Sequence, residues 1–209
     1  DAVRMLVARR STGELQHTSF DHLPDVLDPG DLVVINTSAT LPAALTGISC
    51  TDGRPVVVHL STRLDDGRWV VEPRRPTGRS SERWPPDEGD PPRHVGVGED
   101  GACLELLEPY RGERLWVARL DAPRPVPDWL ADNGRPIRYD HVARPWPLST
   151  YQNTYAVEPG SAEMASAGRP FTPEVVTRLV ARGIAVAPIV LHTGVASLEA
   201  DEVPYPERL

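Results

Sequence analysis

The sequence contains no lysine: all 22 of its basic residues are arginines, and 30 aspartates and glutamates outnumber them. The absence of lysine excludes a lysine Schiff base, a lysine general base and a P-loop lysine from these 209 residues. The formal net charge of −8 argues against indiscriminate nucleic-acid binding, which requires broad neutralisation of phosphates. One local basic surface is compatible with this charge.

Long apolar runs, cysteines and aromatic residues are also scarce. No stretch reaches the roughly 20 apolar residues of a membrane-spanning helix, and no signal peptide is visible, so we expect a cytoplasmic protein without a membrane partner. The two cysteines, Cys50 and Cys103, lack a CxxC partner, which disfavours a zinc site. We expect two buried thiols in a reducing compartment, with a single disulfide as the alternative. Because aromatic residues make up only 6%, aliphatic side chains must build the core.

Two apolar runs without alternation, residues 32–35 and 184–191, are typical of parallel strands buried on both faces. A helix is predicted to begin before the second run. There Thr172 can cap the helix, Pro173 occupies its first position, and Glu174 favours the positive end of the helix dipole. These segments predict an α/β domain.

Between the two α/β segments, short strands separated by turns predict a small antiparallel β-barrel or sandwich. The expected strands cover residues 46–50, 55–61, 68–72, 102–107 and 114–120. We therefore expect an α/β fold with an inserted small antiparallel β-barrel domain. The expected bounds are 1–46 and 145–209 for the discontinuous α/β domain, and 47–144 for the inserted domain with its linker.

A stretch rich in proline, arginine and acids, residues 73–93, interrupts the predicted strands. Its arginines alternate with acids, so its charge is nearly balanced. We interpret it as a solvated, partly disordered loop. The alternative is a nucleic-acid surface on which Trp69 and Trp84 stack on bases.

Three polar clusters follow apolar strands or introduce a helix, where α/β proteins usually bind ligands. The first is Asn36-Thr37-Ser38, and the third is His192-Thr193-Gly194. The second, within residues 159–172, is rich in small residues that let a ligand approach the backbone near a helix N-terminus. His192 is the one histidine directly after a predicted buried strand, and it can act as an acid, base or donor near neutral pH. A histidine that merely closes the strand is the alternative.

Four segments resemble, in order and spacing, parts of the S-adenosylmethionine:tRNA ribosyltransferase-isomerases of queuosine biosynthesis. Residues 28–45, DPGDLVVINTSATLPAAL, resemble the family's PGDLLVFNDTRVIPARL, and residues 151–156, YQNTYA, resemble its YQTVYA. Residues 159–172, PGSAEMASAGRPFT, resemble its PGSVAAPTAGLHFT, and residues 191–194, LHTG, resemble its LHVG. The resemblance spans nearly the whole chain, and the inserted strands fall where the family has its barrel.

The resemblance implies an enzyme that moves the ribosyl group of S-adenosylmethionine onto a 7-deazaguanine base in a tRNA anticodon, with release of adenine and methionine. S-adenosylmethionine would be a substrate, no cofactor or metal would be needed, and tRNA would be the partner. His192 would be the catalytic acid or base. The implied substrate-binding residues are Asn36, Thr37, Tyr151, Gly168, Arg169, Phe171 and Thr172.

The sequence departs from the family's segments at positions that carry chemistry. Ala39 and Ala44 stand where the family has arginines, and Pro170 stands where it has a histidine. Since alanine cannot replace a bidentate guanidinium contact, two alternatives stay open. One is an enzyme on the same scaffold that acts on a nucleoside or a small molecule derived from S-adenosylmethionine, and the other is a non-catalytic binding module. The resemblance also implies a further C-terminal part of the same chain beyond Leu209.

Overall fold

The computed structural model describes residues 3–78, 80–110, 112, 114–139 and 142–195. Its contacts divide the chain into two units, each built from several segments. We name them the α/β unit and the barrel unit. The α/β unit takes its described residues from Asp1–Ala39, Gln152–Pro159 and Met164–Leu191, and the barrel unit takes them from Thr40–Tyr151, Gly160–Glu163 and His192–Leu209.

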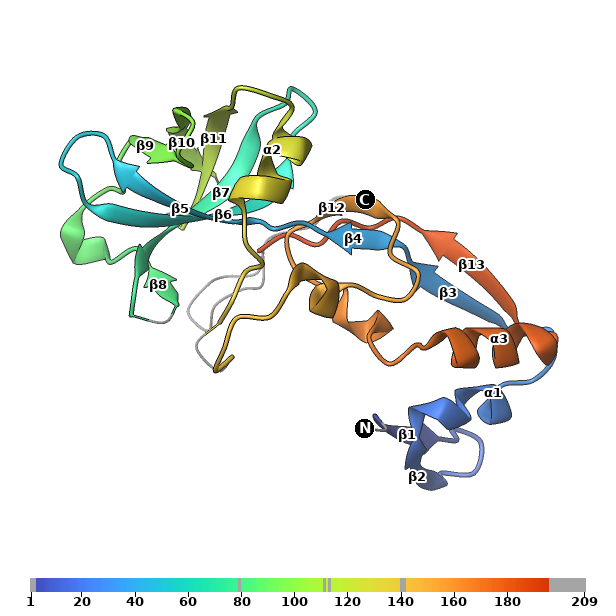
Figure 1. Cartoon of the computed structure of the whole chain (residues 1–209). Helices are drawn as coiled ribbons and strands as arrows, with labels where there is room; N and C mark the ends of the chain where they lie inside the picture. The colour runs from blue at the N-terminus through green and yellow to red at the C-terminus, as the bar shows by residue number, and fades with distance from the viewer. Residues whose placement is uncertain (1–2, 79, 111, 113, 140–141, 196–209) are drawn as a thin grey trace. The chain divides into compact units, whose positions relative to one another are not determined.

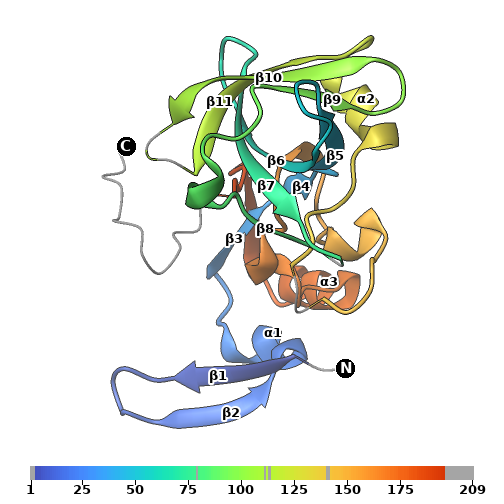
Figure 2. The same cartoon turned by 90° about the vertical axis from the view of Figure 1, so that its left-hand side faces the viewer.

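Six antiparallel strands of the barrel unit form a closed ring in the order β11-β10-β9-β5-β6-β7 (Figure 2). The ring closes because β11 pairs with both β10 and β7, and β8 adds a further strand next to β7. The strands are β5 (Ala44–Ser49), β6 (Pro55–Arg63), β7 (Trp69–Pro76), β8 (Ser81–Arg83), β9 (His94–Val97), β10 (Ala102–Tyr110) and β11 (Leu115–Asp121). The predicted inserted barrel is confirmed.

Aliphatic side chains fill the interior of the barrel, as the scarcity of aromatic residues predicts. Val56, Val58 and Leu60 of β6 are fully buried, and so is Leu104 of β10. Helix α2 (Val126–Asn133) adds Trp129 and Leu130 to the same core. Because Pro125 and Pro127 flank its start, the sequence there looks like a linker, and the helix was not predicted.

The stretch 73–93 is structured, so its interpretation as a solvated loop is wrong. It holds the end of β7, strand β8, the 3-10 turn η2 (Pro86–Glu88) and the buried Trp84, whose Nε1 donates to the carbonyl of Gly89 at 3.0 Å. Its charges alternate because they pair, as when Arg75 binds Glu82 and Glu88. Trp69 is also buried, so the alternative of two exposed stacking platforms is wrong as well.

The α/β unit combines an antiparallel hairpin with a parallel strand pair and two helices (Figure 1). Its elements are β1 (Arg4–Ala8), β2 (Leu15–Ser19), the 3-10 turn η1 (Phe20–His22), α1 (Leu23–Val26), β3 (Leu32–Asn36), the 3-10 turn η4 (Ser166–Gly168), α3 (Pro173–Ala181) and β13 (Ala185–Ile189). β13 pairs with β3 in parallel, from Ala185 opposite Leu32 to Ile189 opposite Asn36. The predicted parallel pair is thus confirmed. Strand β4 (Ser38–Thr40) pairs with β12 (Glu158–Ser161), and the bounds of the two units fall within both strands, while the 3-10 turn η3 (Leu148–Tyr151) belongs to the barrel unit.

Within the described residues only one face of the parallel pair is covered, so the expectation of burial on both faces is wrong for this part of the chain. Val33 packs toward a small core formed by Val175 and Leu179 of α3 with Ile184. On β3, Leu32 and Val34 are 59% and 54% exposed, because α1 and α3 lie on the other side of the two strands. The helices of this unit pack against one side of the two strands, so the opposite side remains exposed.

Helix α3 begins as predicted, since Thr172 caps it by accepting a hydrogen bond from the backbone N–H of Val175 at 3.3 Å. After its C-terminal cap, Gly183 adopts a φ of 77°, which favours glycine. The cysteines are free, as expected, but Cys50 is exposed and Cys103 is only partly buried. The expectation of two buried thiols is therefore wrong for Cys50, which lies just beyond the end of β5.

Candidate functional site

The end of β3 holds Asn36 and Thr37 in a dense set of hydrogen bonds within the α/β unit. The side chain of Asn36 donates to the carbonyl of Leu191 at 2.8 Å and accepts from the backbone N–H of Leu191 at 3.0 Å. The hydroxyl and N–H of Thr37 both donate to the carbonyl of Ile189. These bonds extend the parallel pairing beyond β13, so both residues hold the strand that leads to His192.

The segment after Tyr151 brings the predicted residues near the start of α3 together. The side chain of Asn153 donates to the carbonyl of Ala165 at 3.0 Å, and the hydroxyl of Thr154 donates to the carbonyl of Phe171 at 2.9 Å. The ring of Tyr155 meets that of Phe171 edge-on, with ring centres 5.6 Å apart. At Gly168 a β-carbon would lie 2.3 Å from the Tyr155 hydroxyl, so only glycine fits there.

Two polar groups in this part of the α/β unit are available to a ligand. The Oδ1 atom of Asn153 is buried and has no hydrogen-bond partner among the described residues, a costly state for a buried acceptor. The guanidinium of Arg169 is exposed and, within the same described ranges, has no ion-pair partner. Thr172 is already engaged as the cap of α3. A ligand N–H could satisfy Asn153, and an anion could pair with Arg169.

His192 belongs to the barrel unit, where its imidazole lies on the backbone of Gly160. A β-carbon at Gly160 would lie 2.3 to 2.5 Å from three ring atoms of His192: Cε1, Nδ1 and Nε2. Similar distances to three ring atoms place the ring face against this glycine. Gly160 therefore makes room for the imidazole, which is exposed to solvent.

The segments around Gly160 and His192 are held together next to the ring. The backbone N–H of Thr193 donates to the Oγ of the fully buried Ser161 at 3.0 Å, and the N–H of Ala162 donates to the carbonyl of Thr193 at 2.7 Å. Further along, the N–H of Val195 donates to Ser61 at 3.0 Å. His192 thus projects from a fixed loop and keeps an accessible imidazole, as an acid or base requires.

A cluster of buried charges lies inside the barrel unit. Glu72 is 2% exposed, its Oε1 accepts a 2.5 Å hydrogen bond from Arg74, and its Oε2 lies 3.5 Å from the guanidinium of Arg114. His59 lies 4.0 Å from the same carboxylate, but the two guanidinium groups already engage Glu72. Burial, together with the charge of Arg74, lowers the pKa of His59 to about 3. The imidazole of His59 is therefore neutral at physiological pH.

Tyr151, the other predicted residue in the barrel unit, lines a pocket of about 360 Å³. Its carbonyl accepts a 2.6 Å hydrogen bond from the hydroxyl of Thr40, which leaves the side chain at the pocket wall. The pocket also takes in Ala44, where the resemblance places an arginine in the family. Arg135, whose backbone pairs with that of Ala44 through two hydrogen bonds of 2.8 and 2.9 Å, lines the same pocket.

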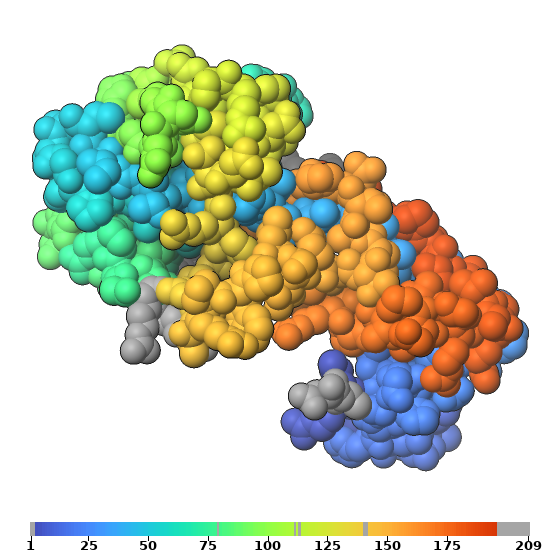
Figure 3. Space-filling view, viewed as in Figure 1, coloured from blue at the N-terminus to red at the C-terminus, as the bar shows by residue number. Residues whose placement is uncertain are grey.

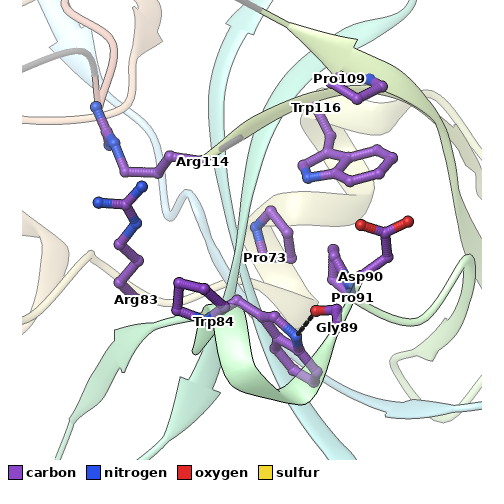
Figure 4. A pocket seen from close by; sticks show the side chains of 10 residues that line it. Pro73, Arg83, Trp84, Gly89, Asp90, Pro91, Pro109, Arg114 and Trp116 are labelled. Atoms are coloured by element: carbon purple, nitrogen blue, oxygen red, sulfur yellow. Dashed lines mark hydrogen bonds between the residues drawn. The ribbon is translucent and has the colours of Figure 1, made fainter. Parts of the chain in front are cut away.

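A second pocket of about 290 Å³ in the barrel unit contains none of the predicted site residues. Figure 4 shows Arg83 and Arg114 on one side of it, with Trp116 and Asp90 on the other. Both signs of charge and several prolines line this pocket, so it has no clear electrostatic preference.

No group of three or more His, Cys, Asp or Glu side chains in the described ranges could hold a metal ion. No helix in the described part of the chain is long and apolar enough to cross a membrane.

Comparison with known proteins places these features in a family. A family model described as queuosine biosynthesis protein matches residues 1–208. The chain belongs to this family. It is 31% identical over its full length to an S-adenosylmethionine:tRNA ribosyltransferase-isomerase from Thermotoga petrophila, 33% to one from Symbiobacterium thermophilum, and 32% over 97% of its length to one from Moorella thermoacetica.

The chain spans 57 to 58% of the length of these queuosine biosynthesis relatives and matches their N-terminal part. Among solved structures, it is similar to an S-adenosylmethionine tRNA ribosyltransferase from Thermotoga maritima, with 24% identity and a TM-score of 0.36. This likeness covers 92% of the chain and 51% of that structure.

The residues predicted from the queuosine-family segments differ in part from those that the geometry of the structure points to. The residues named from the segments fall into two sets, Asn36, Thr37, Gly168, Arg169, Phe171 and Thr172 in the α/β unit, and Tyr151 and His192 in the barrel unit. Their roles in binding and catalysis stay predictions. Sequence reasoning missed the orphan acceptor of Asn153 and the pocket cations Arg135 and Arg138. Asn153 lies in a quoted segment and could have been found there, whereas the two arginines have no motif.

Proposed function

We propose that the protein containing this chain is an S-adenosylmethionine:tRNA ribosyltransferase-isomerase of queuosine biosynthesis. The observation that carries the proposal is 31 to 33% identity, over nearly the entire chain, to relatives that bear this name. The relatives are longer than the chain, so the proposed activity includes the part that they carry beyond the matched region. A tRNA substrate would place the enzyme in the cytoplasm.

His192 is the proposed catalytic acid or base. The positive sulfonium of S-adenosylmethionine acidifies the adjacent C5′ hydrogens, so a nearby base can remove one of them. The exposed imidazole on Gly160 offers a ring nitrogen for that purpose and can return the proton later. S-adenosylmethionine is consumed in this scheme, and no cofactor takes part in any proposed step.

The remaining candidates are proposed to bind or to position. Asn36 and Thr37 are positioning residues, since their hydrogen bonds fix the backbone of Ile189 and Leu191 in the α/β unit. Gly168 and Phe171 are proposed ligand contacts near the orphan acceptor of Asn153, and the exposed guanidinium of Arg169 suits a carboxylate or phosphate. Thr172 supports them by capping α3, and Tyr151 is a proposed contact in the 360 Å³ pocket.

A second candidate is an enzyme of the same scaffold that acts on a small nucleoside-like molecule. The observation that favours it is the loss of two arginines at Ala39 and Ala44, both of which are small side chains in largely buried strands. A binding module without activity is the third reading. The three hypotheses differ in the fate of S-adenosylmethionine: it reacts only with tRNA, it reacts without tRNA, or it is bound without reacting.

The test is adenine release from S-adenosylmethionine by the full natural protein, with and without tRNA that carries the 7-deazaguanine base. The proposal predicts release that requires the tRNA. Release without tRNA supports the small-molecule enzyme, and binding of S-adenosylmethionine without release supports the binding module. Either of the last two results contradicts the proposed function.

A further inference from the structure

The charged side chains among the described residues that line the 360 Å³ pocket of the barrel unit are arginines. Arg135 and Arg138 line it, together with Thr46, Ser80 and Ser81, and no acidic residue of the described ranges is among its lining residues. Neither guanidinium has an ion-pair partner in the described part of the chain. In a chain of net charge −8, this pocket therefore offers a local site for an anion.

Most other arginines of the barrel unit are neutralised by carboxylates. Arg54 binds Asp52, Arg68 binds Asp66, and Arg119 binds Glu105, all at 2.6 to 2.7 Å. Arg75 and Arg124 are likewise paired. Two unpaired arginines at one pocket thus contrast with the pairing elsewhere, and a phosphate matches their bidentate donors.

Aromatic side chains line the same pocket. Trp146 is 41% exposed, which is unusual for so large an apolar side chain, and the guanidinium of Arg144 lies 3.9 Å from the centre of its ring. Tyr151 and the neutral His59 also line the pocket. In the space-filling view, gold atoms of the stretch that precedes residue 150 are visible at the surface (Figure 3). An exposed tryptophan supported by a cation is suited to stack on a planar base.

We propose that this pocket binds a nucleotide, with its phosphate at Arg135 and Arg138 and its base on Trp146. The volume of about 360 Å³ lies within the range typical of ligand pockets. The inference rests on the proposed function where the nucleotide belongs to the tRNA. The same chemistry would also accept a free nucleoside monophosphate, so the experiment must include both ligands.

The experiment measures the dissociation constants of AMP and of a short single-stranded RNA for the full natural protein, by quenching of tryptophan fluorescence. The variant is Arg135→Ala with Arg138→Ala, and the control is Arg63→Ala, an exposed arginine at the end of β6 without an ion-pair partner in the described ranges. We expect the double variant to weaken RNA binding at least about tenfold and to lower its salt slope by about 0.7 per lost phosphate contact. The control should bind as the wild type does.

The base contact has its own test. Measured by the anisotropy of a labelled RNA, which does not depend on Trp146 as the reporter, Trp146→Ala should weaken binding about fivefold or more, while Trp146→Phe, which keeps an aromatic face, should retain most of the affinity. Trp146→Phe should also abolish most of the fluorescence quenching if Trp146 is the residue that stacks. Binding of AMP and RNA together supports a site for either source, and binding of RNA alone assigns the site to the RNA substrate.

Two results would overturn the inference: wild-type affinity in the double arginine variant, or no binding of either ligand to the wild type. The proposed function is judged separately by adenine release. If adenine release fails while the arginine variants still lose nucleotide affinity, the nucleotide site is supported and the proposed function is contradicted. If adenine release depends on tRNA but the arginine variants bind RNA normally, the proposed function is supported and the assignment of the pocket as a nucleotide site is contradicted.

Discussion

The two units of the chain bury their apolar strands to different extents. In the barrel unit, six strands close into a ring, and Leu60 and Leu104 become inaccessible to solvent. In the α/β unit, the described parallel sheet has two strands, and Leu32, Val34 and Leu191 remain 54 to 59% exposed. Ring closure pairs strand edges and encloses a core, whereas a two-stranded pair can only cover one face.

This difference extends to charged groups. The barrel unit buries a carboxylate between two guanidinium groups, and two further arginines at a pocket have no ion-pair partner among the described residues. The α/β unit uses its polar side chains at the end of β3 to hold backbone. Stability should therefore depend more on single side chains in the barrel unit, and this contrast can be measured.

The largest effect is expected from Glu72→Gln. Without the carboxylate charge, the buried cations Arg74 and Arg114 both lose a buried counter-charge, so the free energy of unfolding should fall by about 3–5 kcal/mol. Urea denaturation measures it. The control is Glu105→Gln, whose partner Arg119 is 67% exposed, and its effect should stay below about 1 kcal/mol. Equal effects of the two substitutions would contradict the importance of the buried cluster.

A pair of leucine substitutions compares the two units directly. Leu104→Ala in the barrel core should cost about 2–5 kcal/mol, because it leaves a cavity in a fully buried site. Leu32→Ala, at a side chain that is 59% exposed, should cost well under half as much. Denaturant unfolding of both variants gives the comparison. A large cost at Leu32 would mean that the outer face of β3 is covered in the protein in solution.

The pH dependence of stability should carry a contribution from His59. Its pKa is about 3 in the folded state, against 6.5 for an unperturbed histidine, so below pH 6.5 the unfolded state binds a proton that the folded state excludes. Stability should fall as the pH decreases from 6.5 toward 3. Between pH 7 and pH 4.5 the loss from His59 amounts to about 2–3 kcal/mol. His59→Gln should lose less stability than the wild type over this interval, and parallel pH profiles would refute the assignment.

The smallest effect is expected at the helix cap of the α/β unit. Thr172→Ala removes the acceptor for the N–H of Val175 and should lower stability by about 1 kcal/mol. Thr172→Ser keeps the oxygen and should cost much less. Thermal unfolding followed by circular dichroism distinguishes them. If serine were as destabilising as alanine, the methyl group of Thr172 would matter more than its hydroxyl.

Features set by local patterns were predictable from the sequence. The cap at Thr172, the strands of the barrel and the parallel pairing of β3 with β13 all follow from residue types and spacing. Features that depend on distant partners were not. The stretch 73–93 looks like a loop because its charges alternate, but Arg75 pairs with Glu82 and Glu88 only once the strands are formed.

The candidate site likewise contains features that local sequence patterns predict and features that depend on distant partners. His192 could be named from its place after an apolar run, while the need for Gly160 beneath its ring appears only in three dimensions. Arg135 and Arg138 belong to no motif, and the fold brings them to the same pocket as Trp146. Domain bounds at residues 46/47 and 144/145 stay a prediction.

The most direct test of the proposed chemistry is the rate of tRNA-dependent adenine release by Gly160→Ala compared with the wild type. A β-carbon would lie 2.3 Å from the His192 ring and must displace it, so we expect a loss of about 100-fold or more, similar to that of His192→Ala. Gly78→Ala is the matched control, since its β-carbon meets no atom within 4 Å. Circular dichroism establishes that both variants fold. A folded Gly160→Ala protein that releases adenine at the wild-type rate, or a wild type that releases none with tRNA, would contradict the role proposed for His192.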